Sequence, residues 1–341
     1  MNSTVISGSY YDIGYKTGSQ WKSVLELPVP LPAKQALARQ CREIAQEYTP
    51  DLLEEMKGFC DGGNFDREAI EAFLLVLGYE FFHPSKGGCT VFGIAGDLTD
   101  SGFPIFARNY DWDVTFQPMC GVSFRHPLGR LKSVSFSDHM IGCYGGVNEA
   151  GLAIAILLAS DFGTEWLPGI RVNLSSRWVL DHHQSTEEAV AFLEEIPHVR
   201  GQLFMIADKG GHIARVETSP PHLQTTHAEK GYLFSTNHYQ AESLKRHSNP
   251  AFITPNSLTR FEKVKDFIEN RKEKISVKDV MTFLSSHANG VCNHLEFEGV
   301  EIATIYSWIA EIRDHSNPIQ LWSTTGSPCK NPYEQLSYFY S

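Results

Sequence analysis

The sequence comprises 341 residues, of which 42% are hydrophobic, and it carries a formal net charge of −11 at pH 7. A chain of this length and composition predicts one large α/β domain with a smaller segment attached. Because nucleic acids and anionic membranes bind basic surfaces, the acidic balance argues against both as partners. No apolar run reaches the roughly 18 residues of a membrane span, and the first residues lack a signal-peptide pattern, so we expect a cytoplasmic protein.

Seven scattered cysteines, without a C-x-x-C pair, predict neither a disulfide framework nor a cysteine zinc site. His287, Cys292 and His294 have metal-ligating side chains but no standard spacing. The neighbouring His182 and His183 point in different directions on a predicted helix. We therefore predict no metal site, and phosphate-binding and nucleophile-elbow motifs are also missing.

The first 88 residues show mainly helical patterns. Gly14 and Gly18 lie four residues apart, which is typical of a helix that another element approaches closely, although a flexible loop is the alternative. Helices are expected at residues 33–48, 50–62 and 67–82. Thr49 and Asp66 are the expected N-caps of the second and third helices. The third is apolar nearly all round at residues 72–77, so we expect it to be buried against a sheet.

After Gly87 the spacing of apolar residues changes from every three to four residues, typical of a helix, to every second residue, typical of a strand. Strands are expected at residues 90–96, 104–111, 121–126, 132–137, 142–146, 152–159, 202–208, 212–217, 233–237, 304–312 and 319–325. Helices are expected at residues 171–182, 186–196, 257–271 and 276–286. This order predicts an α+β fold, a four-layer αββα sandwich of two antiparallel sheets with a helical N-terminal segment. Residues 1–88 should pack on the core, and residues 89–341 should form the catalytic domain.

The first predicted hairpin brings reactive side chains together. It places the Cys89 thiol at the start of one strand, opposite Arg108 and Asp111 at the end of the next. A fixed cation beside a thiol stabilises the thiolate, which is the nucleophilic form. The alternatives are an ordinary buried thiol and a structural ion pair within the hairpin.

The glycine before the cysteine makes a further reaction possible. Without a side chain on Gly88, the backbone can bend so that the Cys89 sulfur reaches the Gly88 carbonyl. An N-to-S acyl shift followed by hydrolysis would release a new amino terminus on Cys89. Its α-amine, with an ordinary pKa of about 7.7–8.0, would serve as general base for the thiol of the same residue.

A series of motifs runs along nearly the whole chain in a characteristic order and spacing. They lie at residues 8–18, 48–58, 88–90, 108–112, 146–152, 235–239, 257–261 and 326–329. In these motifs the chain resembles the acyl-coenzyme A:6-aminopenicillanic acid (isopenicillin N) acyltransferase family. Members of this family are N-terminal nucleophile hydrolases, related more distantly to penicillin V acylase and choloylglycine hydrolase.

The resemblance implies self-cleavage between Gly88 and Cys89, which would give chains of 88 and 253 residues. It also implies that Arg108 favours the thiolate and that Asp111 holds the new α-amine by a charge-assisted hydrogen bond. Asn237 matches the asparagine whose side-chain amide donates to the oxyanion of the reaction. The alternative for Asn237 is a turn residue at a strand end.

Four further residues are assigned on the same basis. Asn148 is expected to be catalytic, although a purely conformational role in its glycine-rich turn is equally open. Arg260 resembles the active-site arginine of the choloylglycine hydrolases, with a surface helix charge as the alternative. Together with Tyr110 and Trp112 it is assigned to substrate binding.

Three hypotheses remain. The first is a self-cleaving amidohydrolase or acyltransferase that forms a thioester on Cys89. Its substrate would be a small amide or acyl-CoA-like molecule. It would need no cofactor, although a coenzyme A thioester is an optional co-substrate. The second is an uncleaved papain-like enzyme that pairs Cys89 with a histidine such as His238. The third is an uncleaved, non-catalytic protein that binds a ligand in the same cleft. We favour the first; the oligomeric state stays open.

Overall fold

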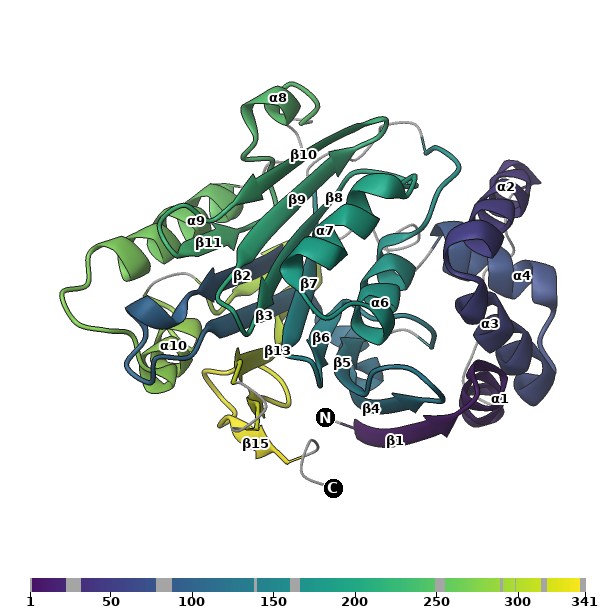
Figure 1. The fold of residues 1–341 in the computed structure, drawn as a ribbon, viewed down its shortest axis with the longest axis horizontal. Coiled ribbons are helices and arrows are strands. Elements are labelled where there is room, and N and C mark those ends of the chain that lie inside the picture. The colour runs from purple at the N-terminus through teal and green to yellow at the C-terminus, as the bar shows by residue number, and fades with distance from the viewer. Residues whose placement is uncertain are drawn as a thin grey trace.

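The computed structural model describes residues 2–22, 32–77, 88–137, 140–159, 166–248, 255–288, 291–297, 299–313 and 318–337. Figure 1 shows two stacked sheets, helices on the outer side of the sheets, and a further group of helices at one flank. Among the described residues, no helix is both long and apolar enough to cross a membrane.

The first sheet has the strand order β1-β4-β5-β6-β7-β8-β9-β10 in the described part of the chain. Its strands are β1 (Asn2–Gly8), β4 (Gly121–Pro127), β5 (Ser133–Ser137), β6 (Gly145–Asn148), β7 (Leu152–Leu158), β8 (Gln202–Asp208), β9 (Ile213–Ser219) and β10 (His222–His227). Neighbouring strands are antiparallel except at one edge, where β1 pairs with β4 in parallel. The N-terminal segment therefore contributes an edge strand, which the sequence patterns did not predict.

The second sheet has the order β11-β2-β3-β13-β14-β15, and β12 also pairs with β13. Its strands are β2 (Gly88–Ile94), β3 (Ile105–Asp113), β11 (Tyr232–Ser235), β12 (His294–Phe297), β13 (Val300–Glu311), β14 (Gln320–Ser323) and β15 (Glu334–Leu336). The residues of β2 and β3 are buried along their whole lengths. Both faces of this hairpin are therefore covered, and its polar side chains lie inside the protein.

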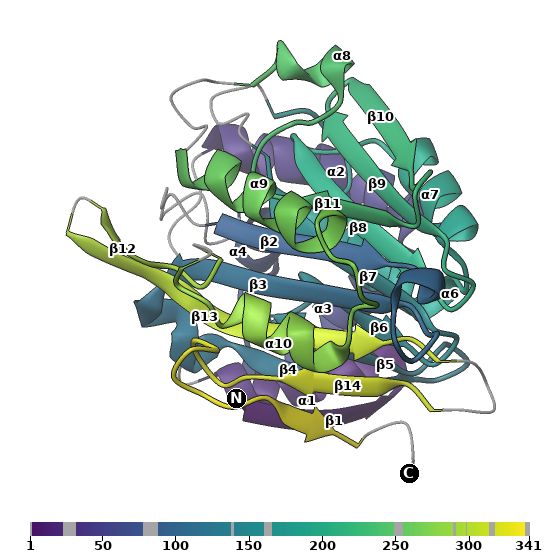
Figure 2. The same cartoon turned by 90° about the vertical axis from the view of Figure 1, so that its left-hand side faces the viewer.

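Helices complete the outer layers. Helices α6 (Val172–His182) and α7 (Thr186–Glu195) pack on the first sheet. Helices α9 (Pro255–Glu269) and α10 (Val277–Leu284) pack on the second sheet, as Figure 2 shows. The short helix α8 (Glu242–Lys245) contacts β9 and β10. Because β2 contacts β7 and β8 of the other sheet, the four layers follow each other directly, and the predicted αββα sandwich is confirmed.

The N-terminal helices pack on one another through glycines. They are α1 (Tyr10–Trp21), α2 (Pro32–Tyr48), α3 (Pro50–Gly63) and α4 (Arg67–Ala72). A Cβ atom added to Gly14 would lie 1.9 Å from the Glu55 carbonyl oxygen, and one added to Gly18 would lie 2.1 Å from the Phe59 carbonyl oxygen. The close approach that we expected at these glycines is confirmed, and α3 is the approaching element.

Three local predictions need correction. The helix expected at residues 67–82 is an α-helix only to Ala72; a π-helical turn follows at Phe73–Leu77, and residues 78–87 lie outside the described residues. Its described part, residues 67–77, packs mainly on α2 and α3. Thr49 occupies the expected N-cap position of α3, but its side chain does not cap the helix, because its hydroxyl donates to the Ala45 carbonyl. The strand expected at residues 142–146 begins only at Gly145.

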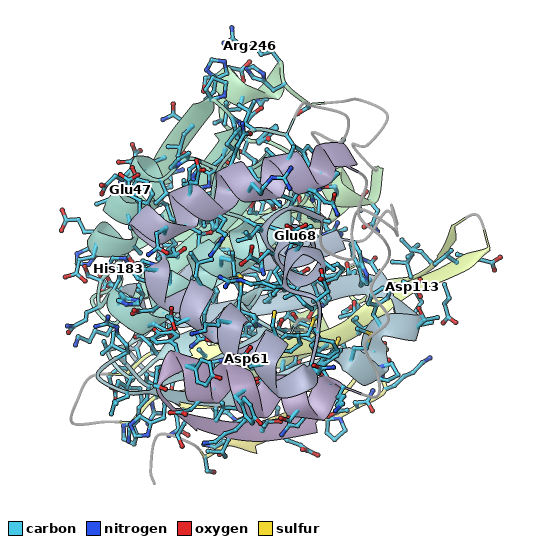
Figure 3. All side chains as sticks on the ribbon, turned by 90° about the vertical axis from the view of Figure 1, so that its right-hand side faces the viewer. Glu47, Asp61, Glu68, Asp113, His183 and Arg246 are labelled. Carbon is cyan, nitrogen blue, oxygen red and sulfur yellow. The ribbon has the colours of Figure 1, made fainter. Side chains whose placement is uncertain are left out.

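Buried charges fasten the N-terminal helices to the sandwich. The Glu55 carboxylate of α3 lies 3.2 Å from Arg125 of β4 and 3.1 Å from Arg177 of α6. Arg177 also pairs with Asp181 at 2.9 Å, and the Asp181 carboxylate accepts a hydrogen bond from the Tyr10 hydroxyl of α1. By contrast, acidic side chains such as those labelled on these helices in Figure 3 lie at the surface.

Glu55→Ala is expected to lower the free energy of unfolding by about 3–5 kcal/mol, because it removes the carboxylate that pairs with the buried Arg125 and one of the two carboxylates that pair with the buried Arg177. Thermal unfolding of purified protein measures the change as a lower melting temperature. The control is Glu54→Ala on the same helix, an exposed position where the change should stay within about 0.5 kcal/mol. Equal melting temperatures for the two variants would contradict the role assigned to this ion-pair network.

Candidate active site

The predicted hairpin of β2 and β3 is present. Gly88 pairs with Asp111 across the ladder, and Cys89 pairs with Tyr110. Both strands lie inside the second sheet, flanked by β11 and β13. The pairing of the two strands therefore brings Cys89 close to Arg108 and Asp111, as the sequence predicted.

The Cys89 thiol lies beside a buried guanidinium. The Nη2 atom of Arg108 donates to the Cys89 sulfur at 3.4 Å, and Nη1 donates to the Tyr144 carbonyl. Both side chains are buried. Burial raises the pKa of the Cys89 thiol, and the neighbouring Arg108 charge opposes that rise. In the uncleaved chain Arg108 thus reduces the rise in the pKa of Cys89 but does not cancel it. Near neutral pH the side chain is therefore mainly a thiol.

Asp111 occupies a second buried position next to the Gly88–Cys89 bond. Its Oδ1 atom accepts a hydrogen bond of 2.6 Å from the Thr304 hydroxyl, and its Oδ2 atom accepts one from the Asn293 amide. Burial raises the pKa of Asp111, and the charge of Arg260 opposes this. A Cβ atom added to Gly88 would lie 3.0 Å from Asp111 Oδ2, so only glycine leaves the carboxylate this close to the bond.

Arg260 lies inside the protein and not on the surface of α9. Its Nη1 atom donates to the Cys89 carbonyl and, at 3.1 Å, to the Thr90 hydroxyl. Its Nη2 atom donates to Asn237 Oδ1 at 3.0 Å, and Nε donates to Asn256 at 2.6 Å. The alternative of a surface charge is therefore wrong. Arg260 contacts the backbone of Cys89 and is not among the residues that line the adjoining pocket.

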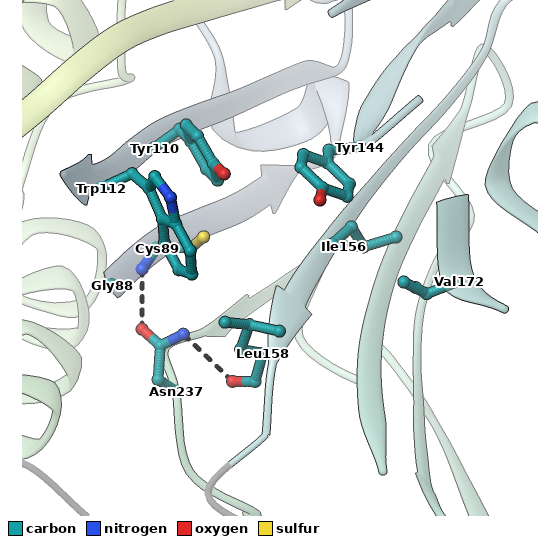
Figure 4. Close-up of a pocket in the computed structure, with 9 residues that line it drawn as sticks. All are labelled: Gly88, Cys89, Tyr110, Trp112, Tyr144, Ile156, Leu158, Val172 and Asn237. Carbon is teal, nitrogen blue, oxygen red and sulfur yellow. Dashed lines mark hydrogen bonds between the residues drawn. The ribbon is translucent and has the colours of Figure 1, made fainter. Parts of the chain in front are cut away.

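Asn237 lies on the other side of the Cys89 backbone. Its Oδ1 atom accepts a hydrogen bond of 2.7 Å from the Cys89 backbone nitrogen. Its Nδ2 atom donates to the Leu158 carbonyl at 3.0 Å, as Figure 4 shows. One hydrogen of the Asn237 amide is therefore occupied in the uncleaved chain, which leaves the second as the candidate donor to an oxyanion.

Asn148 is not brought to this site. Its Nδ2 atom donates to the carbonyls of Leu180 and His183, and its Oδ1 atom accepts from the backbone nitrogens of Ala150 and Leu152. These bonds use the hydrogen-bonding capacity of the amide to hold a turn against the end of α6. The catalytic assignment of Asn148 is therefore corrected to a structural one.

The histidine considered for a papain-like mechanism has its Nδ1 atom beside two hydroxyl groups. The Nδ1 atom of His238 lies 2.9 Å from the Ser257 hydroxyl and 3.2 Å from the Thr236 hydroxyl. Burial lowers the pKa of His238 to about 4, so the ring is neutral near pH 7. The hydrogen bond to the Cys89 sulfur comes from Arg108 instead.

A narrow apolar pocket opens at the sulfur (Figure 4). The space inside the pocket that the centre of a water molecule can reach is about 10 Å³. The lining residues are Gly88, Cys89, Tyr110, Trp112, Tyr144, Ile156, Leu158, Val172 and Asn237. The predicted substrate-binding residues Tyr110 and Trp112 thus lie beside Cys89, and their rings stack at 6.1 Å between centroids.

Several residues of the site were not predicted. Asn293 and Thr304 hold Asp111, and Asn256 holds both Arg260 and Asn293. Tyr144 positions Arg108 and lines the pocket. These are common polar and aromatic residues without a motif of their own, so only the fold identifies them.

Comparisons with known proteins agree with this architecture. The family model of acyl-coenzyme A:6-aminopenicillanic acid acyl-transferase matches residues 98–321. No curated protein matches the sequence.

Among solved structures, the chain is similar to a variant of conjugated bile acid hydrolase from Clostridium perfringens, with 15% identity and a TM-score of 0.50, over 74% of this chain and 93% of that chain. It is also similar to penicillin V acylase from Agrobacterium tumefaciens (19% identity, TM-score 0.47, 70% of this chain and 83% of that chain). The chain is also similar to the Caenorhabditis elegans ortholog of N-acylethanolamine-hydrolyzing acid amidase (14% identity, TM-score 0.45, 65% of this chain and 92% of that chain).

The sandwich and the family match together define the class of protein: an enzyme of the N-terminal nucleophile hydrolase superfamily, which contains amide hydrolases and acyltransferases. The chain belongs to the acyl-coenzyme A:6-aminopenicillanic acid acyl-transferase family, and the predicted resemblance is confirmed. The matched residues include Arg108, Asp111, Asn237 and Arg260 but begin after Cys89. The case for Cys89 as nucleophile therefore rests on its own surroundings.

Proposed function

We propose that the chain cleaves itself between Gly88 and Cys89 and then acts as a linear amide hydrolase or N-acyltransferase through the Cys89 thiol. The observation that carries this proposal is the position of the Cys89 backbone nitrogen. It donates to Asn237, and the residue before it lies opposite Asp111 in the ladder. A base released at this nitrogen would be held next to the thiol that it serves.

Self-cleavage would use only groups already at the bond. The Cys89 sulfur attacks the Gly88 carbonyl carbon, the bond from that carbon to the Cys89 nitrogen breaks, and the thiol proton passes to the nitrogen. Water then hydrolyses the thioester, which leaves a carboxylate on Gly88 and a free thiol on Cys89. Arg260 holds the Cys89 carbonyl during these steps, so the backbone on the far side of the reacting bond stays fixed.

Turnover of a substrate amide would follow the same pattern. The α-amine of Cys89 takes the thiol proton, and the sulfur attacks the substrate carbonyl. The leaving amine accepts the proton, and a thioester forms on Cys89. Asn237 offers its second amide hydrogen to the oxyanion, while Asp111 and the Asn237 oxygen hold the protonated α-amine. Water completes hydrolysis, and an amine or thiol acceptor completes acyl transfer.

The pocket favours an apolar acyl group. Its lining side chains are mainly aromatic and aliphatic. Burial of an apolar chain against such residues contributes roughly 25 cal/mol for each Å² removed from water. We therefore propose a small amide with an apolar acyl chain as substrate, with an acyl-CoA thioester as optional co-substrate. Residues 1–88 would remain bound to residues 89–341 after cleavage through the Glu55 ion pairs, and the cytoplasm is the proposed location.

The proposed function predicts a trapped acyl-enzyme. A panel of N-acyl amides with straight-chain and aryl acyl groups is mixed with the protein and quenched in acid, and the masses of the denatured chains are measured. One acyl group should appear on the chain that begins at Cys89, and neutral hydroxylamine should remove it. Cys120→Ala, a second buried cysteine near Phe116, should be acylated like the unaltered protein. Acylation elsewhere, or none with any amide, would count against the proposal.

Self-cleavage is expected to accelerate with pH. Burial raises the pKa of Cys89, so the thiolate fraction is small near pH 7 and continues to grow above the ordinary thiol pKa of about 8.5. A time course of cell-free synthesis, pulsed with label and chased between pH 6.5 and 9, measures the rate. A rate that levels off below about pH 8 would show that the thiol is not the titrating group.

A further inference from the structure

Four side chains with metal-ligating atoms meet beside the second sheet: His287, Cys292, His294 and Cys329. Each offers one ligand atom, and these atoms all lie within 4.8 Å of one another. The Nε2 atom of His294 is 3.2 Å from the Cys329 sulfur and 3.9 Å from the Cys292 sulfur. The rings of His287 and His294 pack edge to face at 5.0 Å. Within the described ranges, no second group of three or more such side chains meets in this way.

We propose that these four residues bind one zinc ion. Zinc prefers a tetrahedral set of thiolates and imidazoles with bonds of about 2.0–2.3 Å, which places the ligand atoms about 3.3–3.8 Å apart. The separations in the structure lie within about an ångström of that range, so small side-chain rotations complete the tetrahedron. Two thiolates and two neutral imidazoles balance the charge of the ion. Four protein ligands leave no open position, so the zinc would be structural.

The fold explains why the sequence did not predict this site. His287 follows α10, Cys292 precedes β12, His294 is the first residue of β12, and Cys329 lies in a turn after β14. The ligands thus come from three segments, and the last one is far from the others in the sequence. The Cys292 nitrogen donates to the Ser286 carbonyl at 3.3 Å, which holds the residue before His287 next to Cys292. The expectation of no metal site, based on spacing alone, is replaced by this proposal.

The proposed zinc site adjoins the candidate active site. Asn293 stands between two ligands, and its side-chain amide donates to Asp111. Its backbone nitrogen donates to the Thr304 hydroxyl at 2.9 Å, and that hydroxyl donates to Asp111 as well. The zinc would therefore fix the segment that positions Asp111. This consequence for activity rests on the proposed function, whereas zinc binding itself does not.

Zinc content tests the proposal without any measurement of activity. The full-length chain, purified with a reductant and without a metal-binding tag, should contain about one zinc per chain by elemental analysis. Chelated protein should take up one equivalent of Zn²⁺. With Co²⁺ it should show the near-ultraviolet thiolate-to-cobalt absorption, which a site of histidines alone would not give.

Two variants locate the site. Cys329→Ser should lower the zinc content below about 0.1 per chain, and the exposed His287→Gln should weaken Zn²⁺ binding at least tenfold without unfolding the protein. The matched control is His247→Gln, which removes one ring of another histidine pair, His222 and His247, outside the cluster. Zinc below 0.1 per chain in the unaltered protein even after reconstitution, or unchanged zinc in both cluster variants, would overturn the proposal. So would a disulfide between Cys292 and Cys329 that persists in reductant.

Discussion

Cys89→Ala is expected to lower kcat/KM for hydrolysis of the best N-acyl amide by a factor on the order of 10³ or more. The variant removes the only atom that can form the thioester in the proposed mechanism, and it also prevents release of the α-amine. Neither Arg108 nor Asn237 can replace these functions, because a guanidinium and a neutral amide are neither nucleophiles nor bases near neutral pH. Initial rates with the acylation panel measure the loss.

The control separates chemistry from folding. Cys89→Ala removes one sulfur from a buried position, so its melting temperature is measured beside that of Cys120→Ala. Cys120→Ala should retain activity within a few-fold. If Cys89→Ala melts like Cys120→Ala and still hydrolyses the amide at a comparable rate, the nucleophile is another group.

Gly88→Ala is expected to slow self-cleavage by a factor on the order of 10². The added Cβ atom would lie 2.8 Å from Arg260 Nη2 and 3.0 Å from Asp111 Oδ2. Arg260 cannot move freely, because it is buried and donates to Asn256 and to the Cys89 carbonyl. The substitution therefore displaces either the arginine or the carboxylate from the bond that breaks. The fraction of uncleaved chain in a pulse-chase time course measures the effect.

Gly93→Ala on the same strand is the matched control. Its Cβ atom would meet a methyl group of Ile213 at 3.0 Å, so it crowds β2 without touching the site. It should lower stability modestly while self-cleavage proceeds at nearly the normal rate. Equal rates for both glycine variants would mean that the contacts of Gly88 do not control the reaction.

The sequence predicted those parts of the site that depend on neighbouring segments. Cys89, Arg108 and Asp111 lie on two consecutive strands joined by residues 95–104, so the alternating apolar pattern and the turn residues were enough to bring them together. The sandwich followed from the order of long, strongly patterned elements. By contrast, β1 was missed because it is largely polar, with Val5 exposed at the sheet edge.

The parts that were missed depend on contacts between distant segments. Asn293 and Thr304 reach Asp111 across 182 and 193 residues of sequence, and no local pattern marks either residue. Asn148 was assigned to catalysis from its motif, yet its hydrogen bonds hold a turn. A motif identifies a residue that matters, but only the packing around it distinguishes a chemical role from a conformational one.

The most direct test is the intact mass of the purified protein under denaturing conditions. The uncleaved chain has a mass of 38.3 kDa. Scaling this mass by chain length gives fragments of about 9.9 and about 28.4 kDa for cleavage after Gly88. We expect both fragments from the unaltered protein, with Cys89 as the first residue of the larger one, and a single 38.3 kDa chain, less one sulfur, from Cys89→Ala. An active protein that remains a single uncleaved chain would contradict self-cleavage and the α-amine base together.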